Sequence, residues 1–96
     1  MQLLALEREL PTPSAEDFAL LLLEEARVLW MLVQAGIVRE AWFRADQHTA
    51  VLMLECASVE AAQTQLARLP LVQAGMIAFD ILTLTPYDGF ARLFTP

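Results

Sequence analysis

The feature of this sequence that most constrains its fold is a regular alternation of strand-like and helix-like segments. Strand-like segments rich in apolar, β-branched or aromatic residues cover residues 2–9, 37–45, 48–56 and about 76–85. A long helix is predicted over about residues 15–34, and a shorter one begins after Ser58 and stops at Pro70. This order predicts an α+β domain of the ferredoxin-like βαββαβ type, a four-stranded antiparallel sheet with two helices on one face.

Residues that break or cap regular structure mark the ends of the long helix. Pro11 and Pro13 end the first strand-like segment, because proline removes a backbone donor and disfavours helix in the residue before it. Ser14, with Asp17 three residues later, resembles a capping box at a helix start. Gly36 is expected to end the same helix at its C-terminus.

The composition predicts self-association. The chain has 96 residues, which suits one domain over residues 1–96, and 57% of them are hydrophobic against 19% charged. A domain this small cannot bury so many apolar side chains in its own core, so we expect a homodimer or a larger ring. Two sheets packed face to face, as in a dimeric α/β barrel, would cover the sheet face that the helices leave open.

The C-terminal tail, residues 86–96, is unusually apolar for a chain end. Tyr87, Phe90, Leu93 and Phe94 fall within these eleven positions. We expect the tail to pack on the body of the domain or on a neighbouring subunit.

Several classes of partner and site are not expected. The net charge is −6, and the six basic residues form no run, which argues against nucleic acid. The longest apolar run, residues 18–23, is far too short to span a membrane, and the N-terminus lacks signal-peptide features, so a cytoplasmic protein is predicted. One cysteine and one histidine without ligand spacing predict no metal and no other cofactor.

Beyond these general features, the second half of the chain carries a specific pattern. It reads GIVREAWFRA, then LECASVEAAQTQLARLPL, then MIAFDILTLTP. In this order and spacing it resembles the muconolactone isomerase family of dimeric α/β-barrel proteins. The matched positions are Gly36, Arg39, Trp42, Glu55, Ser58, Val59, Glu60, Ala61, Leu69, Pro70, Leu71 and Asp80.

Three departures from the family pattern are visible. Phe43 stands where the pattern has a second arginine, and Arg44 follows one residue later. Gln47 stands where the pattern has a histidine, and His48 follows. A slip of one residue in a strand reverses the face that a side chain occupies. The third departure is the apolar tail, because the family enzyme ends in a polar segment.

The resemblance implies a cavity on the sheet face near subunit contacts, a small anionic unsaturated lactone or related carbonyl compound as substrate, and a role in aromatic catabolism. Shifting the double bond of such a compound needs a group that moves a proton and a cation or donor that holds the developing enolate. The candidates for proton transfer are Asp80, Glu55 and His48. The candidates for substrate binding are Arg39, Trp42, Arg44 and Tyr87.

Each candidate also has a plain structural interpretation. Asp80 could form an ion pair with Arg39 or Arg44, and Glu55 and His48 could be solvated residues beside turns. Alternation along residues 37–45 puts Trp42 and Arg44 on one face of the strand and Arg39 on the other. A non-catalytic oligomeric domain, binding a small ligand or filled by its own side chains, is therefore the alternative hypothesis.

Overall fold

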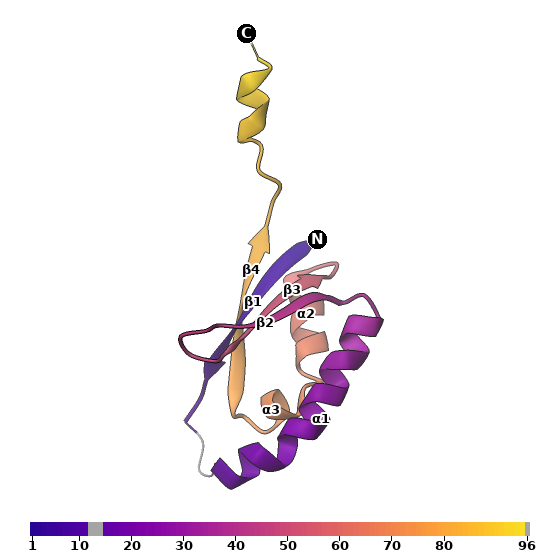
Figure 1. Cartoon of the computed structure of the whole chain (residues 1–96). Coiled ribbons are helices and arrows are strands. Elements are labelled where there is room, and N and C mark those ends of the chain that lie inside the picture. Colours follow the sequence, from indigo (N-terminus) through magenta and orange to yellow (C-terminus); the bar gives the residue numbers. More distant parts are fainter. Residues whose placement is uncertain (12–14, 96) are drawn as a thin grey trace.

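The structure is a computed structural model that describes the backbone of residues 1–11 and 15–95 and the side chains of residues 1–11 and 18–95. The cap predicted at Ser14 and Asp17 lies outside the described residues. The elements, shown in Figure 1, are β1 (Gln2–Glu9), α1 (Ala15–Gln34), β2 (Val38–Phe43), β3 (Ala50–Glu55), α2 (Val59–Leu66), α3 (Pro70–Gln73), β4 (Ile77–Leu84) and the 3₁₀ helix η1 (Gly89–Leu93). The predicted ferredoxin-like α+β fold is confirmed, with α3 and η1 as additions.

All strand pairs of the sheet are antiparallel, and the strand order is β2-β3-β1-β4. The first strand of the sequence is therefore central. Leu4 of β1 faces Met53 of β3 on one side and Leu82 of β4 on the other. The β2–β3 ladder contains one irregularity, between Val38 and Glu40. A β-bulge at this point leaves Arg39 without a direct partner across the ladder.

The helices cover one face of the sheet, which we call the helix face. Its centre is fully buried and consists of Leu3 and Ala5 from β1 with Leu52 and Leu54 from β3. Leu32 of α1 and Leu66 of α2 pack on these residues to form the main core. Burying one leucine side chain contributes about 1.5–3 kcal/mol to the free energy of unfolding, compared with leaving it exposed to water. This layer is therefore the main source of stability.

The opposite face of the sheet, which we call the open face, is covered by no element among the described residues of the same chain. Alternation along the strands places a continuous set of apolar side chains there, namely Leu4, Leu6, Trp42, Val51, Met53, Leu82 and Leu84. Trp42 is 65% exposed and Leu82 is 50% exposed. An apolar surface of this extent is characteristic of an interaction site.

Several boundaries differ from the sequence prediction, and the second strand ends at Phe43 rather than at residue 45. The third strand begins at Ala50 rather than at His48, because His48 has a φ of 54° and cannot continue a strand. Pro70 was expected to stop the second helix, yet it also begins α3 as its first residue. Proline suits that position because its fixed φ matches the helix and its missing N–H would have no partner there.

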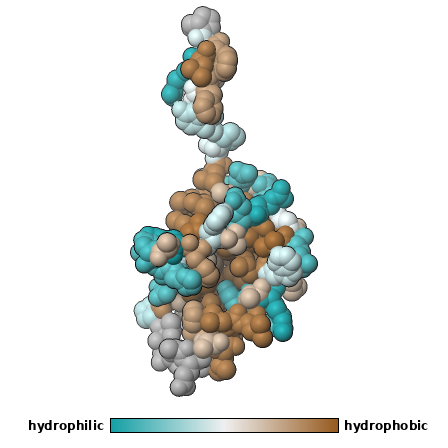
Figure 2. Space-filling model, in the orientation of Figure 1, coloured by the Kyte–Doolittle hydropathy of each residue, from teal (hydrophilic) through white to brown (hydrophobic). Residues whose placement is uncertain are grey.

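The tail leaves the end of β4 and extends away from the sheet and helices, as Figure 1 shows. The chain consequently measures 61 × 28 × 20 Å along its principal axes. Figure 2 shows hydrophobic surface on the outer part of the tail, separated by a paler stretch from the hydrophobic surface of the body. The tail was predicted to pack either on the body of the domain or on a neighbouring subunit. Within the single chain it does not pack on the body.

Candidate functional site

A hollow of about 530 Å³ lies at the end of the sheet next to the β2–β3 connection. We call it the turn-end hollow. It is lined by Leu6, Glu7, Arg8, Glu9, Arg44, Gln47, Thr49 and Asp80. Two of the residues predicted from the sequence are thus brought together, Asp80 from β4 and Arg44 from the connection that follows β2, although β2 and β4 are not neighbours in the sheet. The volume falls within the range of small-molecule sites.

Asp80 projects from the open face, where it lies opposite Leu6 of β1. Its carboxylate oxygen Oδ1 lies 3.4 Å from Nε of Arg8. An ion pair was one of the alternatives for Asp80, but its partner is Arg8 rather than Arg39 or Arg44. Both side chains are more than half exposed, so this pair contributes little to stability.

Arg44 is held by Asp46 within the connection between β2 and β3. Its Nε and Nη2 donate to the two carboxylate oxygens of Asp46 at 3.1 and 2.8 Å. The Arg44 hydrogen bonds lower the pKa of Asp46, which therefore stays ionised at neutral pH. The bidentate geometry fixes the direction of the guanidinium group at the rim of the turn-end hollow.

Glu7 is a carboxyl group of the hollow that no sequence pattern singles out. Its Oε1 accepts a hydrogen bond from the backbone N–H of Ala50 at 3.3 Å. Burial raises the pKa of Glu7, and the Ala50 hydrogen bond opposes this only in part. A raised carboxyl pKa brings proton exchange closer to neutral pH, which is the property expected of a general acid or base.

Thr49 also lines the hollow, and it is the one buried polar residue among those the structure describes. Its hydroxyl oxygen has no hydrogen-bond partner among the described residues. Its backbone carbonyl accepts from the N–H of Arg44 at 2.8 Å, which closes the connection between the two strands. Burying this hydroxyl beside the hollow without a hydrogen bond therefore lowers the stability of the fold.

His48 lies in the same connection but does not line the hollow. Its ring stacks on that of Phe43 with the centroids 4.0 Å apart. Its backbone N–H donates to the carbonyl of Arg44 at 2.8 Å. The left-handed backbone of His48 turns the chain so that Thr49, rather than His48, faces the turn-end hollow.

Glu55 lies at the other end of the sheet. It faces Gln2 across the ladder, four residues along β1 from the partner of Asp80, which is about 13 Å. Its Oε1 accepts from the amino group of Met1 at 2.7 Å. Glu55 lines a separate hollow of about 370 Å³ together with Met1, Gln2, Leu84 and Pro86.

Arg39 and Trp42 lie on β2, outside the turn-end hollow. Arg39 is in the bulge, and its guanidinium group lies close to Gly36, 3.6 Å from where a Cβ would be. Trp42 is on the open face opposite Val51 and also borders a small apolar hollow of about 110 Å³. Trp42 is therefore available to a partner sheet, whereas Arg39 lies at the opposite end of β2 from the hollow.

Tyr87 is carried away from the sheet with the tail. Its ring meets that of Phe90 edge to face, with centroids 4.7 Å apart. Within one chain it contributes nothing to the turn-end hollow.

Arg8 and Glu7 were missed because nothing in their local sequence distinguishes them. The strand pattern QLLALERE indicates polar residues toward its end, which normally means a solvated strand end. Only the register of β1 against β4, which pairs Leu6 with Asp80, places Arg8 beside that carboxylate. A long-range register of this kind is not readable from a single sequence.

The described ranges contain neither a cluster of metal ligands nor a membrane-spanning helix. Nowhere in residues 1–11 and 18–95, whose side chains the structure describes, do three or more histidine, cysteine, aspartate or glutamate side chains gather in a way that would hold a metal ion. Over the same ranges, no helix has both the length and the apolar character needed to cross a membrane.

Comparison with known proteins gives a structural match. No protein-family model matches the sequence, and no curated protein matches it. The structure is similar to the crystal structure of muconolactone isomerase, with a TM-score of 0.76, 21% sequence identity and coverage of 92% of each chain. The chain therefore has a muconolactone isomerase-like fold. At this level of identity the match describes the fold and leaves the activity open.

Proposed function

We propose that this protein binds a small anionic unsaturated carbonyl compound, such as a lactone, in the turn-end hollow and shifts its double bond by proton transfer. The observation that carries the proposal is the convergence of Arg8, Arg44 and Asp80 on one hollow beside an apolar sheet face. The likeness of the fold to muconolactone isomerase supports the same class of substrate. A cytoplasmic location and a role in aromatic catabolism remain predictions from the sequence.

The chemistry needs one base and one cationic group. The Asp80 carboxylate would remove a proton from the carbon next to the substrate carbonyl, and the electron pair would move onto the carbonyl oxygen. Arg8 or Arg44 would hold the resulting enolate oxygen and the substrate carboxylate. Asp80 would then return the proton to the far carbon of the conjugated system, so that atoms and charge balance without a cofactor.

The site is expected to be completed by a second copy. Three of the residues that line the hollow, Leu6, Arg8 and Asp80, lie on the open face, whose apolar side chains are unprotected in the single chain. Two such faces packed together would remove water from the hollow, which strengthens the interactions of the arginine groups with a ligand. We therefore include a face-to-face homodimer in the proposal, in line with the self-association expected from composition.

The test is turnover of a panel of muconolactone-like lactones by the wild type and by Asp80→Asn. We expect a loss of at least about 100-fold in kcat/KM for this variant, the usual contribution of a positioned base. Asp88→Asn, the same chemical change in the tail, is the matched control and should retain wild-type rates. Equal rates for Asp80→Asn and wild type would remove Asp80 from the mechanism, and Glu7→Gln and Glu9→Gln would then test the other two carboxyl groups of the hollow.

A second function, ligand binding without catalysis, is favoured by a different observation. Each arginine of the hollow is already engaged by a carboxylate, Arg8 by Asp80 and Arg44 by Asp46. Acidic side chains also outnumber basic ones among the lining residues, which weakens attraction for an anion. Saturable binding of a lactone by calorimetry, together with no turnover of any compound in the panel, would support this function over the isomerase.

A further inference from the structure

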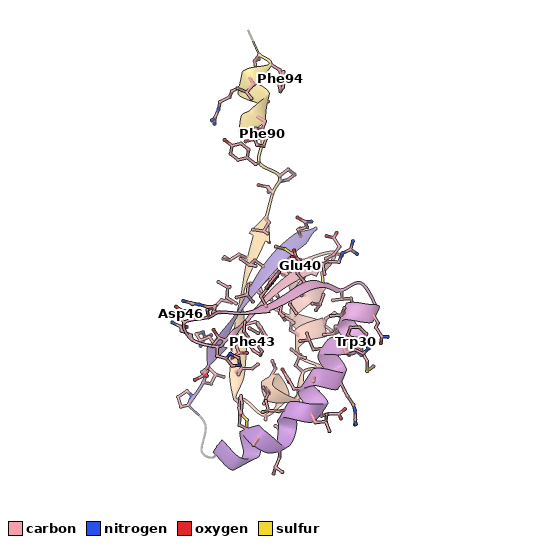
Figure 3. All side chains as sticks on the ribbon, in the orientation of Figure 1. Trp30, Glu40, Phe43, Asp46, Phe90 and Phe94 are labelled. Atoms are coloured by element: carbon pink, nitrogen blue, oxygen red, sulfur yellow. The ribbon has the colours of Figure 1, made fainter. Side chains whose placement is uncertain are left out.

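The turn-end hollow lies where the ladder between β1 and β3 stops. The ladder ends at the pair of Leu6 and Val51, although β1 continues to Glu9. The left-handed backbone of His48 turns the chain before β3 begins, so no described strand continues beside the end of β1 on this side. Figure 3 shows the connection, with Asp46 labelled near its tip, beside the lower end of β1. The side chains at the end of β1 therefore border a hollow instead of a strand.

These side chains divide between the two faces of the sheet. Leu6 and Asp80 are paired across the ladder and lie on the open face. Side chains alternate along a strand, so Glu7 and Glu9 point toward the other face. Both also line the hollow. Together with Thr49 they form what we call the acidic side of the hollow.

The acidic side carries negative charge that no basic side chain of the structure pairs with. The two arginines of the hollow are each bonded to an aspartate. Among the described side chains, neither Glu7 nor Glu9 forms an ion pair. Residues 12–17, which lie outside the described side chains, include no basic residue that could supply one. A cation from outside the chain would therefore be attracted to this side of the hollow.

A buried hydroxyl lies beside these carboxyl groups. Thr49 is only 5% exposed, it lines the hollow, and its hydroxyl has no partner among the described residues. Glu7 accepts from the N–H of Ala50, the residue after Thr49, which brings the Glu7 carboxyl close to Thr49. A hydroxyl oxygen accepts hydrogen bonds, and an ionised carboxylate does nothing else. The acidic side thus offers acceptors from three side chains and is short of donors.

A protonated primary amine has the properties that this side of the hollow calls for. It carries a positive charge and three N–H donors, one for each of the three side chains. All six basic residues of the chain are arginines, so neither this chain nor a second copy can supply a lysine. The amino group of Met1 is bound to Glu55 at the far end of the sheet. Leu6 adds apolar surface for a short alkyl chain, and the volume of about 530 Å³ suits a small molecule.

We propose that the acidic side of the turn-end hollow binds a small organic ammonium ion through Glu7, Glu9 and Thr49. None of these residues moves a proton or holds the anion in the proposed isomerase reaction, so this site does not depend on that activity. Burial raises the pKa of Glu7, and a cation beside its carboxylate would oppose that effect. The Thr49 hydroxyl then gains the hydrogen bond that it lacks in the empty chain.

Calorimetric titration with n-butylammonium chloride at constant ionic strength tests the site. We expect saturable binding to the wild type and binding weaker by about tenfold or more to Glu7→Gln with Glu9→Gln, which keeps the oxygen acceptors and removes both charges. Thr49→Val should weaken binding by about threefold, the loss of one hydrogen bond. The control is Glu24→Gln with Glu60→Gln, the same change at two exposed carboxylates elsewhere, which should bind like the wild type.

Neutral and metallic probes separate the proposal from its alternatives. Butan-1-ol has the size of n-butylammonium without its charge, so it should bind more weakly by about tenfold or more. Equal affinity for the two probes overturns the proposal, as does the absence of saturable binding of n-butylammonium to the wild type. Equal affinities of the wild type and the Glu7→Gln, Glu9→Gln protein would place the ammonium ion elsewhere. Tighter binding of Ca²⁺ than of n-butylammonium, lost in the same variant, would assign these acceptors to a metal ion and also overturn the proposal.

Discussion

Thr49 is the residue whose surroundings fit it least. Its hydroxyl is buried beside the turn-end hollow without a partner among the described residues. Valine has nearly the same shape and no hydroxyl to desolvate, so Thr49→Val should raise the free energy of unfolding by about 1–3 kcal/mol. Urea denaturation measures the change, and Thr83→Val, at an exposed β4 position, should shift it by less than about 0.5 kcal/mol. Destabilisation by Thr49→Val would mean that the hydroxyl is hydrogen-bonded in solution.

Glu25 predicts a pH dependence of stability. Its Oε1 accepts from the backbone N–H of Leu71 at 3.0 Å, which ties α1 to α3, and burial raises the pKa of its carboxyl group above the ordinary value of 4.5. Well below pH 4.5 the group is protonated in both the folded and unfolded states. As pH rises through 4.5 toward the raised pKa, the unfolded state loses the proton first, so the free energy of unfolding falls.

The variant Glu25→Gln keeps an acceptor for Leu71 and has no charge to bury. We therefore expect the fall in unfolding free energy from about pH 4.5 upward to be smaller in this variant than in the wild type. Glu24→Gln, an exposed neighbour, should retain the wild-type slope. Identical slopes for Glu25→Gln and the wild type, measured by urea unfolding, would contradict the assignment.

Among the elements, α2 has the clearest local start signal. Ser58 has extended backbone angles, and its hydroxyl accepts from the N–H of Ala61 at 3.0 Å, while Glu60 lies in the first turn. Ser58→Ala should lower the free energy of unfolding by about 1 kcal/mol, the usual loss of an N-cap. Urea denaturation measures the change.

The control for this cap is Gln63→Ala, because Gln63 is exposed in the middle of the same helix. Alanine is the better helix former, so this substitution should leave the free energy of unfolding unchanged or raise it slightly. Equal effects of Ser58→Ala and Gln63→Ala would show that the cap adds nothing.

The element order could be predicted from the sequence because each segment has the hydrophobic periodicity of a helix or a strand and is bounded by residues that interrupt regular structure. Gly36 ends α1 with a φ of 77°, as its position predicted, since a positive φ costs glycine little. The start of β3 was misplaced because HTAVLMLEC is strand-like throughout, and only the turn geometry at His48 removes its first two residues from the strand. At the start of β3, the strand preference of the sequence and the backbone geometry of His48 therefore disagree.

The candidate site was readable only in part. Alternation grouped Trp42 with Arg44 on one side of the second strand. The register places Trp42 opposite Val51 of the open face, whereas Arg44 follows the end of β2. Alternation could not reveal that Asp80 meets Arg8, because that contact depends on which residues of β1 and β4 are paired. Glu55 and Asp80 were grouped by chemistry, whereas the register places them at opposite ends of the sheet.

At the scale of the whole molecule, the open face makes a prediction about assembly. Leu82 lies in the middle of that face, across from Leu4. Burying a carboxylate there without a partner costs about 3 kcal/mol or more, so Leu82→Glu should weaken the face-to-face dimer by on the order of 100-fold. Analytical ultracentrifugation over a dilution series measures the change, with Gln63→Glu on α2 as the control. A dissociation constant unmoved by Leu82→Glu would place the subunit contact elsewhere.

The central place of β1 in the sheet also bears on how the protein is made. Leu4, near the start of the chain, pairs with Met53 and with Leu82. During synthesis β1 has no neighbour until β3 is complete, and its second edge stays unpaired until β4 has left the ribosome. Closing such long loops is slow, and unpaired apolar strands aggregate. The apolar residues of β1 therefore stay without their full set of strand neighbours until β4 has been translated.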